Sequence, residues 1–136
     1  MATKYTTPEA LIALADGAKQ RAYCPYSKFQ VGAAVVVENG DVFTGCNVEN
    51  ACYPVGVCAE RTAICKAVSE GHTKLVAVAV ITNGKTVNFP CGLCRQSIRE
   101  FGTDVTIYCA KKDRSYQTHK LKELLPLSFG AENLIQ

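Results

Sequence analysis

Two continuous apolar runs, Leu75–Ile81 and Val105–Ala110, limit the possible folds of this chain more than any other feature. A strand that is apolar on both faces has to be covered on both faces, which is typical of a sheet buried between helices. Each run follows a segment with the spacing and the glycine stop signal of a helix, Cys58–Glu70 before the first and Cys91–Phe101 before the second. The pattern predicts an α/β fold in which helices and strands alternate.

The other elements extend this pattern at both ends. Thr7 is a typical N-cap with a proline after it, and apolar residues then recur at helical spacing as far as Ala22. An Asn-Gly turn predicts a hairpin between two short apolar runs. The further strands and the last helix are expected at Val31–Val37, Val42–Cys46, Ser115–His119 and Leu121–Leu125. We therefore expect one domain, residues 1–136, built as a three-layer α/β/α sandwich around a mixed five-stranded sheet with an antiparallel hairpin.

Composition excludes several classes of protein. The chain has 136 residues, 48% of them hydrophobic, which suits one packed domain and argues against disorder. A formal net charge of +3 is too small to indicate a nucleic-acid partner. No apolar run approaches the roughly 18–20 residues of a membrane span, and the first residues lack the pattern of a secretion signal. We expect a cytoplasmic protein with no membrane or nucleic-acid partner.

Eight cysteines are unusual in such a chain, and their spacing matters more than their number. Cys91-Gly92-Leu93-Cys94 at a helix start fits either a redox pair or half of a zinc site. A third thiol, Cys58, stands at the start of another helix, with Glu60 two residues later. Three thiolates and an adjacent acid favour a zinc ion whose fourth position is open to water, because a structural site has no use for the acid.

Alternatives to an open zinc site remain at this point. Cys52 or His119 could supply a fourth ligand and close the site, which would make it a structural zinc module. A redox function is weaker, because it leaves Cys58 unexplained. The remaining thiols are expected to pack as small apolar side chains in or beside core elements: Cys24, Cys46, Cys65 and Cys109.

Charge also has to be balanced at such a site, because Zn²⁺ with three thiolates carries a net negative charge. The N-termini of the two helices can donate N–H groups to the sulfurs. Arg61, beside Glu60, can add a fixed positive charge. Arg95 and Gln96, just after Cys94, are lesser candidates for the same purpose.

The combination Cys58-Ala59-Glu60 and Pro90-Cys91-Gly92-Leu93-Cys94 resembles the zinc deaminase pattern. More narrowly, the chain is similar to the cytidine deaminases of the small, homotetrameric, three-cysteine class. The resemblance extends from about Tyr23 to Leu134 and includes further motifs in the same order: Tyr26–Phe29, Val31–Ala34, Gly45–Ala51 and Leu124–Pro126.

This resemblance implies an activity and a set of site residues. The activity is hydrolytic deamination of cytidine and deoxycytidine to uridine and deoxyuridine, with release of ammonia, in pyrimidine salvage. One zinc ion is held by Cys58, Cys91 and Cys94, and Glu60 moves the protons. The implied substrate contacts are Phe29, Asn47, Glu49, Ala51, Tyr53, Ala59 and Phe129.

Within that set, Asn47 and Glu49 are implied to bind the ribose hydroxyls, and the aromatic residues Phe29 and Phe129 to flank the base. In relatives, Phe129 and the segment around Ala51 and Tyr53 reach the site of a neighbouring subunit, so a homotetramer is expected. A blasticidin-type deaminase and a polynucleotide deaminase would share fold and zinc. The Asn47–Asn50 match argues against the first, and the small net charge argues against the second.

Overall fold

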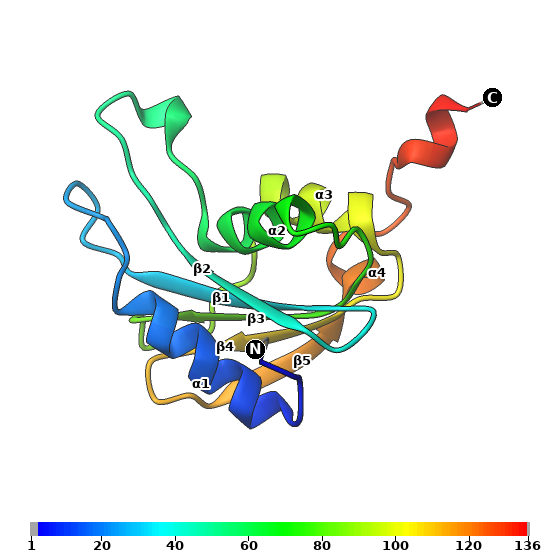
Figure 1. Ribbon diagram of the computed structural model, residues 1–136. Coiled ribbons are helices and arrows are strands. Elements are labelled where there is room, and N and C mark those ends of the chain that lie inside the picture. The colour runs from blue at the N-terminus through cyan, green and yellow to red at the C-terminus, as the bar shows by residue number, and fades with distance from the viewer. Residues whose placement is uncertain (1–2, 136) are drawn as a thin grey trace.

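The computed structural model describes residues 3–135, which form one five-stranded sheet with helices on both faces (Figure 1). In chain order the elements are α1 (Pro8–Lys19), β1 (Val31–Val37), β2 (Val42–Cys46), η1 (Tyr53–Val55), α2 (Ala59–Ser69), β3 (Leu75–Thr82), α3 (Gly92–Phe101), β4 (Thr106–Ala110), β5 (Tyr116–Lys120), α4 (Leu121–Leu124) and η2 (Ala131–Leu134).

The sheet is mixed, with strand order β2-β1-β3-β4-β5. β1 pairs antiparallel with both β2 and β3, β3 pairs parallel with β4, and β4 pairs antiparallel with β5. A parallel pair requires a crossover connection, and α3 provides it. The mixed sheet with an antiparallel hairpin that the sequence predicts is confirmed.

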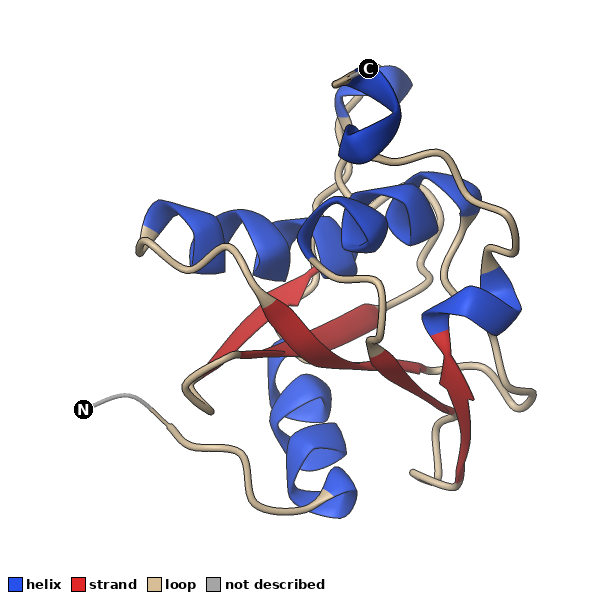
Figure 2. Cartoon of the chain, turned by 90° about the vertical axis from the view of Figure 1, so that its right-hand side faces the viewer, coloured by secondary structure: helices blue, strands red, loops and turns tan. Residues whose placement is uncertain are grey.

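Three layers are visible when the sheet is seen edge-on (Figure 2). α1 covers one face, and α2 and α3 lie on the other face (Figure 1). The strands alternate accordingly: Ala34 and Val36 of β1 pack with Leu11 and Ile12 of α1. The intervening β1 residues pack in the core cluster beneath α2 and α3. The apolar runs in β1, β3 and β4 are thus buried on both faces.

Two glycines let the helices approach the sheet closely. A Cβ atom added at Gly32 of β1 would lie 2.0 Å from the Ala15 carbonyl oxygen of α1. A Cβ atom added at Gly45 of β2 would lie 2.6 Å from the Ala63 nitrogen of α2. Both helices therefore rest directly on strand backbone, and α2 carries residues of the site described below.

The thiols expected to be buried behave differently from one another. Cys109 is fully buried, whereas Cys24 and Cys46 are half-buried. Cys65 is exposed, so its expected burial is wrong. The buried stripe of α2 contains Ala63 and Ala67, and Cys65 lies about 200° around the helix from each of them.

None of the helices within residues 3–135 is both long enough and apolar enough to cross a membrane.

Candidate active site

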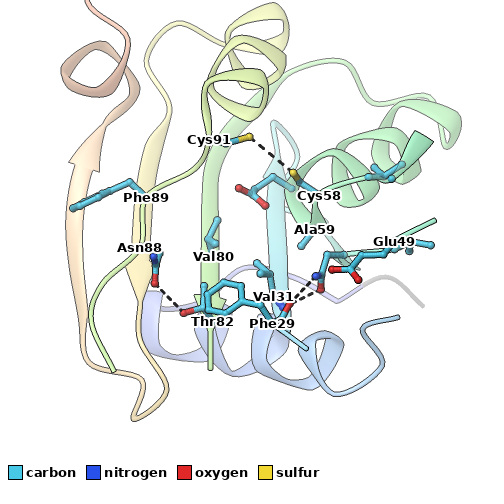
Figure 3. A pocket seen from close by; sticks show the side chains of 15 residues that line it. Phe29, Val31, Glu49, Cys58, Ala59, Val80, Thr82, Asn88, Phe89 and Cys91 are labelled. Carbon is cyan, nitrogen blue, oxygen red and sulfur yellow. Dashed lines mark hydrogen bonds between the residues drawn. The ribbon is translucent and has the colours of Figure 1, made fainter. Parts of the chain in front are cut away.

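Three thiols meet where the N-termini of α2 and α3 converge. Cys58 directly precedes α2, Cys91 directly precedes α3, and Cys94 lies in the first turn of α3. Their sulfur atoms all lie within 4.8 Å of one another, and the Cys58 and Cys91 sulfurs are 3.9 Å apart (Figure 3). Zinc–sulfur bonds of about 2.3 Å in a tetrahedron separate the sulfurs by about 3.8 Å. The cluster therefore fits a zinc ion.

Positive charge and hydrogen-bond donors surround these sulfurs. Arg61 donates from Nη2 to the Cys58 Sγ at 3.6 Å. The hydrogen bond with Cys94 and the Arg61 guanidinium lower the pKa of Cys58 to about 5, against the effect of its partial burial. Hydrogen bonding to Cys58 and burial raise the pKa of Cys94. The environment thus favours a thiolate at Cys58, which is the form that binds metal. Arg61 thus places a positive charge beside one thiol of the cluster.

The Glu60 carboxyl group lies beside the cluster, in the first turn of α2. Only 4% of this residue is exposed. Burial raises the pKa of Glu60, and the negative charge of Cys58 raises it further by a smaller amount. An acid in such surroundings binds a proton more readily than an exposed one and can pass it to a group within reach.

Arg95 and Gln96 donate hydrogen bonds to backbone carbonyl groups. Arg95 donates from Nε to the Pro90 oxygen and from Nη1 to the Leu124 oxygen, each at 2.7 Å. Gln96 donates from Nε2 to the Phe129 oxygen at 3.0 Å. Both residues therefore hold chain segments in place around the α3 N-terminus.

A pocket of about 340 Å³ opens in front of the thiols. It brings together five of the residues expected to act on the substrate or the metal, besides Cys58 and Cys91 at its end: Phe29, Asn47, Glu49, Ala59 and Glu60. Figure 3 shows Cys58 and Cys91 at one end and Phe29 at the other, with Val80 between them. Small-molecule sites commonly have this size and this mixture of apolar walls with few polar groups.

Asn47 and Glu49 also shape the pocket by binding backbone. Asn47 accepts from the Val31 N–H at 2.9 Å and donates to the Phe29 carbonyl at 2.8 Å. Glu49 accepts from the Tyr26 and Ser27 N–H groups at 3.0 and 3.1 Å, and from the Ser27 hydroxyl. The hydrogen bond from the Ser27 hydroxyl has the largest effect among these, and together they lower the pKa of Glu49, which keeps its carboxylate charged.

Three expected substrate contacts lie outside this pocket: Ala51, Tyr53 and Phe129. Tyr53 lines a neighbouring cavity of about 320 Å³ together with Glu49 and Tyr26, whose ring lies 5.8 Å from its own. Phe129 belongs to the C-terminal segment and is 57% exposed. Within the described chain these residues do not reach the thiol cluster.

The two possible fourth ligands also lie apart from the thiol cluster. Among residues 3–135 the metal-binding group consists of the three cysteines, without Cys52 or His119. The His119 ring contacts Phe89 and Gln117 instead. The arrangement therefore matches an open metal site with three protein ligands.

Sequence reasoning missed one wall of the pocket, which is formed by Thr82, Asn88 and Phe89. Thr82 is the last residue of β3, and the carboxyl ends of strands in α/β sheets are where ligands bind. Asn88 and Phe89 stand just before Pro90 and the paired cysteines. Their position next to that motif was the available signal.

A metal-binding thiol cluster, a buried carboxyl and an adjoining pocket on a mixed sheet define the class of this protein as a zinc-binding α/β enzyme. The family model for the cytidine and deoxycytidylate deaminase zinc-binding region matches residues 5–110. The chain belongs to this family.

Curated and structural relatives agree with the family match. A probable cytidine deaminase of Dictyostelium discoideum is 45% identical over 128 residues, which are 93% of this chain and 86% of that protein. A crystal structure of cytidine deaminase from Burkholderia pseudomallei matches with a TM-score of 0.87 and 40% identity, covering 91% of this chain and all of the other. The enzyme of Mycobacterium tuberculosis matches with a TM-score of 0.80 and 39% identity, over 93% and 99% of the two chains.

Proposed function

We propose that this protein catalyses the hydrolytic deamination of cytidine and deoxycytidine to uridine and deoxyuridine, with release of ammonia, as a step of pyrimidine salvage. The observation that supports this most directly is that one pocket is lined by Glu60, by Cys58 and Cys91 of the three-thiol cluster, and by Asn47 and Glu49. Relatives at 42–45% identity named cytidine deaminase support the same substrate.

Cys58, Cys91 and Cys94 would hold the zinc ion. When bound, zinc supplies an activated water at neutral pH, since it lowers the pKa of water to about 7. Glu60 takes a proton from the nucleophile, gives it to ring N3 and then assists the departure of ammonia. Its burial keeps the proton from exchanging with bulk water during these transfers.

The other pocket residues orient the nucleoside. The base lies against Phe29, and its C2 carbonyl accepts from an N–H of the α2 N-terminus at Ala59, where helical donors are unpaired. Asn47 and Glu49 bind the ribose hydroxyls with the hydrogen-bonding capacity that their backbone contacts leave unused. The charged Glu49 repels a phosphate on the sugar, so nucleosides are preferred over nucleotides.

A homotetramer is part of this proposal. Tyr53, at 74% exposure, and Phe129, at 57%, have large apolar surfaces that a neighbouring subunit can cover. In the assembly Ala51, Tyr53 and Phe129 would complete the site of that neighbour. A cytoplasmic location is also part of the proposal, because the three thiols bind metal only when they are reduced.

Ultraviolet absorbance during incubation with cytidine and deoxycytidine tests the activity. The zinc-loaded protein should deaminate both, and removal of zinc by a chelator should abolish turnover until zinc is restored. Glu60→Gln should keep zinc content but lose at least about 100-fold in kcat, the scale of general acid–base catalysis. Deoxycytidylate and a cytosine-containing oligonucleotide are tested in the same assay as alternative substrates. Absence of cytidine turnover by fresh zinc-loaded protein contradicts the proposal.

A further inference from the structure

One wall of the pocket is polar and has no part in the function proposed above. It contains Thr82, at the end of β3, and Asn88, in the loop before α3. Figure 3 shows Asn88 on one side of Val80 and Ala59 and Glu49 on the other side, with Thr82 below Val80 and joined to Asn88 by a hydrogen bond. Polar groups in a pocket provide specificity when their orientation is fixed and their hydrogen bonds are available to a ligand.

Hydrogen bonds fix the orientation of the Asn88 amide. The Gly84 N–H donates to Thr82 Oγ1 at 3.1 Å, and Thr82 Oγ1 donates to Asn88 Oδ1 at 3.4 Å. Because an amide oxygen can only accept, the Thr82 hydroxyl proton is directed to the Asn88 oxygen. The Nδ2 group of Asn88 then carries two N–H donors, for which residues 3–135 provide no recorded acceptor.

The loop that carries Asn88 is held on both sides. The Lys112 N–H donates to the Gly84 carbonyl at 3.1 Å, which ties the loop to the turn between β4 and β5. A Cβ atom added at Gly84 would lie 3.1 Å from Asn88 Oδ1, so the loop is closely packed there. The Phe89 ring meets the His119 ring edge to face, with 5.5 Å between centroids. Asn88 is therefore presented by a supported loop.

The proposed chemistry determines which edge of the base faces Asn88, and this step rests on the function proposed above. Deamination places ring C4 at the thiols, and the ribose on N1, at the opposite end of the ring, points away from them. The C2 carbonyl edge faces the donors at Ala59 and the carboxyl of Glu60. The remaining edge, C5 and C6, faces the opposite wall, which is the wall of Asn88 and Thr82 (Figure 3).

We propose that Asn88, oriented by Thr82, forms a subsite for a hydrogen-bond acceptor on ring C5 of a cytosine nucleoside, such as the hydroxyl of a 5-hydroxymethyl group. Unsubstituted cytosine has only C–H groups at this edge and leaves the Asn88 amide to water. A 5-hydroxymethyl oxygen accepts from Nδ2 directly. Asn88 then determines specificity, and Thr82 is a positioning residue.

Matched substrates isolate this contact. The ratio of kcat/KM for 5-hydroxymethylcytidine to that for 5-methylcytidine compares two substituents that differ by one oxygen, so effects common to both substrates cancel. Asn88→Leu, which keeps the size of the side chain, should lower this ratio about tenfold. That change corresponds to about 1.4 kcal/mol, the scale of one hydrogen bond. Thr82→Val should lower the ratio in the same direction, and Thr82→Ser should restore it.

Asn83→Ala is the control, because it removes another asparagine side chain of the same loop that does not line the pocket. Binding of the products 5-hydroxymethyluridine and 5-methyluridine, measured by titration calorimetry, provides a second readout that needs no turnover. If cytidine is not deaminated, the proposed function fails, while this binding ratio still decides the assignment of Asn88. Ratios of kcat/KM or Kd that are equal in wild type and Asn88→Leu would overturn it.

Discussion

Substitution of Gly45 by alanine tests whether close contact between sheet and helix sets the geometry of the site. A Cβ atom at this position would lie 2.6 Å from the Ala63 nitrogen and 2.8 Å from the Ala59 oxygen, both in the backbone of α2. Ordinary contacts of a Cβ atom begin at 3.4 Å, so α2 would have to move by about 0.8 Å. Neither contact is with a flexible side chain that could turn away.

The expected loss has two parts. Overpacking of this kind costs about 1–3 kcal/mol of the free energy of unfolding. Cys58 is the N-cap of this helix and Glu60 lies in its first turn, so a shift of α2 displaces the proposed metal ligand and the proposed proton carrier together. A misplacement of about 1 Å can cost about 100-fold in rate. We therefore expect Gly45→Ala to lower kcat by about tenfold to 100-fold, with weaker zinc binding.

Gly17→Ala is the matched control. Gly17 lies in α1, and a Cβ atom there meets nothing within 4 Å. The substitution should stabilise the protein by about 0.5–1 kcal/mol and leave kcat unchanged. Denaturant unfolding, zinc content and cytidine turnover are measured for both variants. Wild-type stability and wild-type kcat in Gly45→Ala would refute the reasoning.

Two further substitutions test charged groups. Arg61→Ala should keep the fold but lower zinc affinity or kcat by about tenfold or more, as measured with a competing chelator and by turnover, because Cys58 loses its donor. Asp16→Asn should cost about 3 kcal/mol in urea unfolding at pH 7, because it leaves the buried Lys19 ammonium without its carboxylate. Burial raises the pKa of Asp16, but hydrogen bonds from Lys19 and Arg114 outweigh it and lower that pKa, so this stability is present above about pH 5 and lost on acidification. Asp16→Asn should therefore not show this loss of stability at low pH, and an unchanged pH profile would contradict the expectation. For Arg61→Ala, wild-type zinc affinity together with wild-type kcat would contradict it.

The parts of the site that the sequence predicts are those tied to a helix start. Cys58, Glu60, Cys91 and Cys94 follow from short motifs whose spacing fixes their relative positions on two helices. Asn88 could not be predicted in this way, because it lies in a loop without periodicity and owes its orientation to Thr82 and Gly84. Such tertiary hydrogen bonds leave no pattern in a single sequence.

The same limit applies to side chains that both line the pocket and form hydrogen bonds with the backbone. The turn-like composition around Asn47 and Glu49 indicates polar residues but not their bonds to the backbone of the segment that ends at Phe29. For Cys65 the prediction of burial was wrong. Its apolar character suggested burial, but the stripe of small residues through Ala63 places it on the exposed side of α2.

Topology explains why so many distant residues meet at one place. β3 ends at Thr82, and α3 starts soon afterwards and runs back over the sheet to the beginning of the parallel strand β4. α2 runs against β3 before joining it, so its N-terminus lies at the same edge of the sheet. β1 begins there and β2 ends there, because both pair with the β3 strand or its neighbour in antiparallel register. The loops before β1, after β2 and after β3 therefore line one pocket beneath two helix N-termini, where unpaired N–H groups favour thiolates.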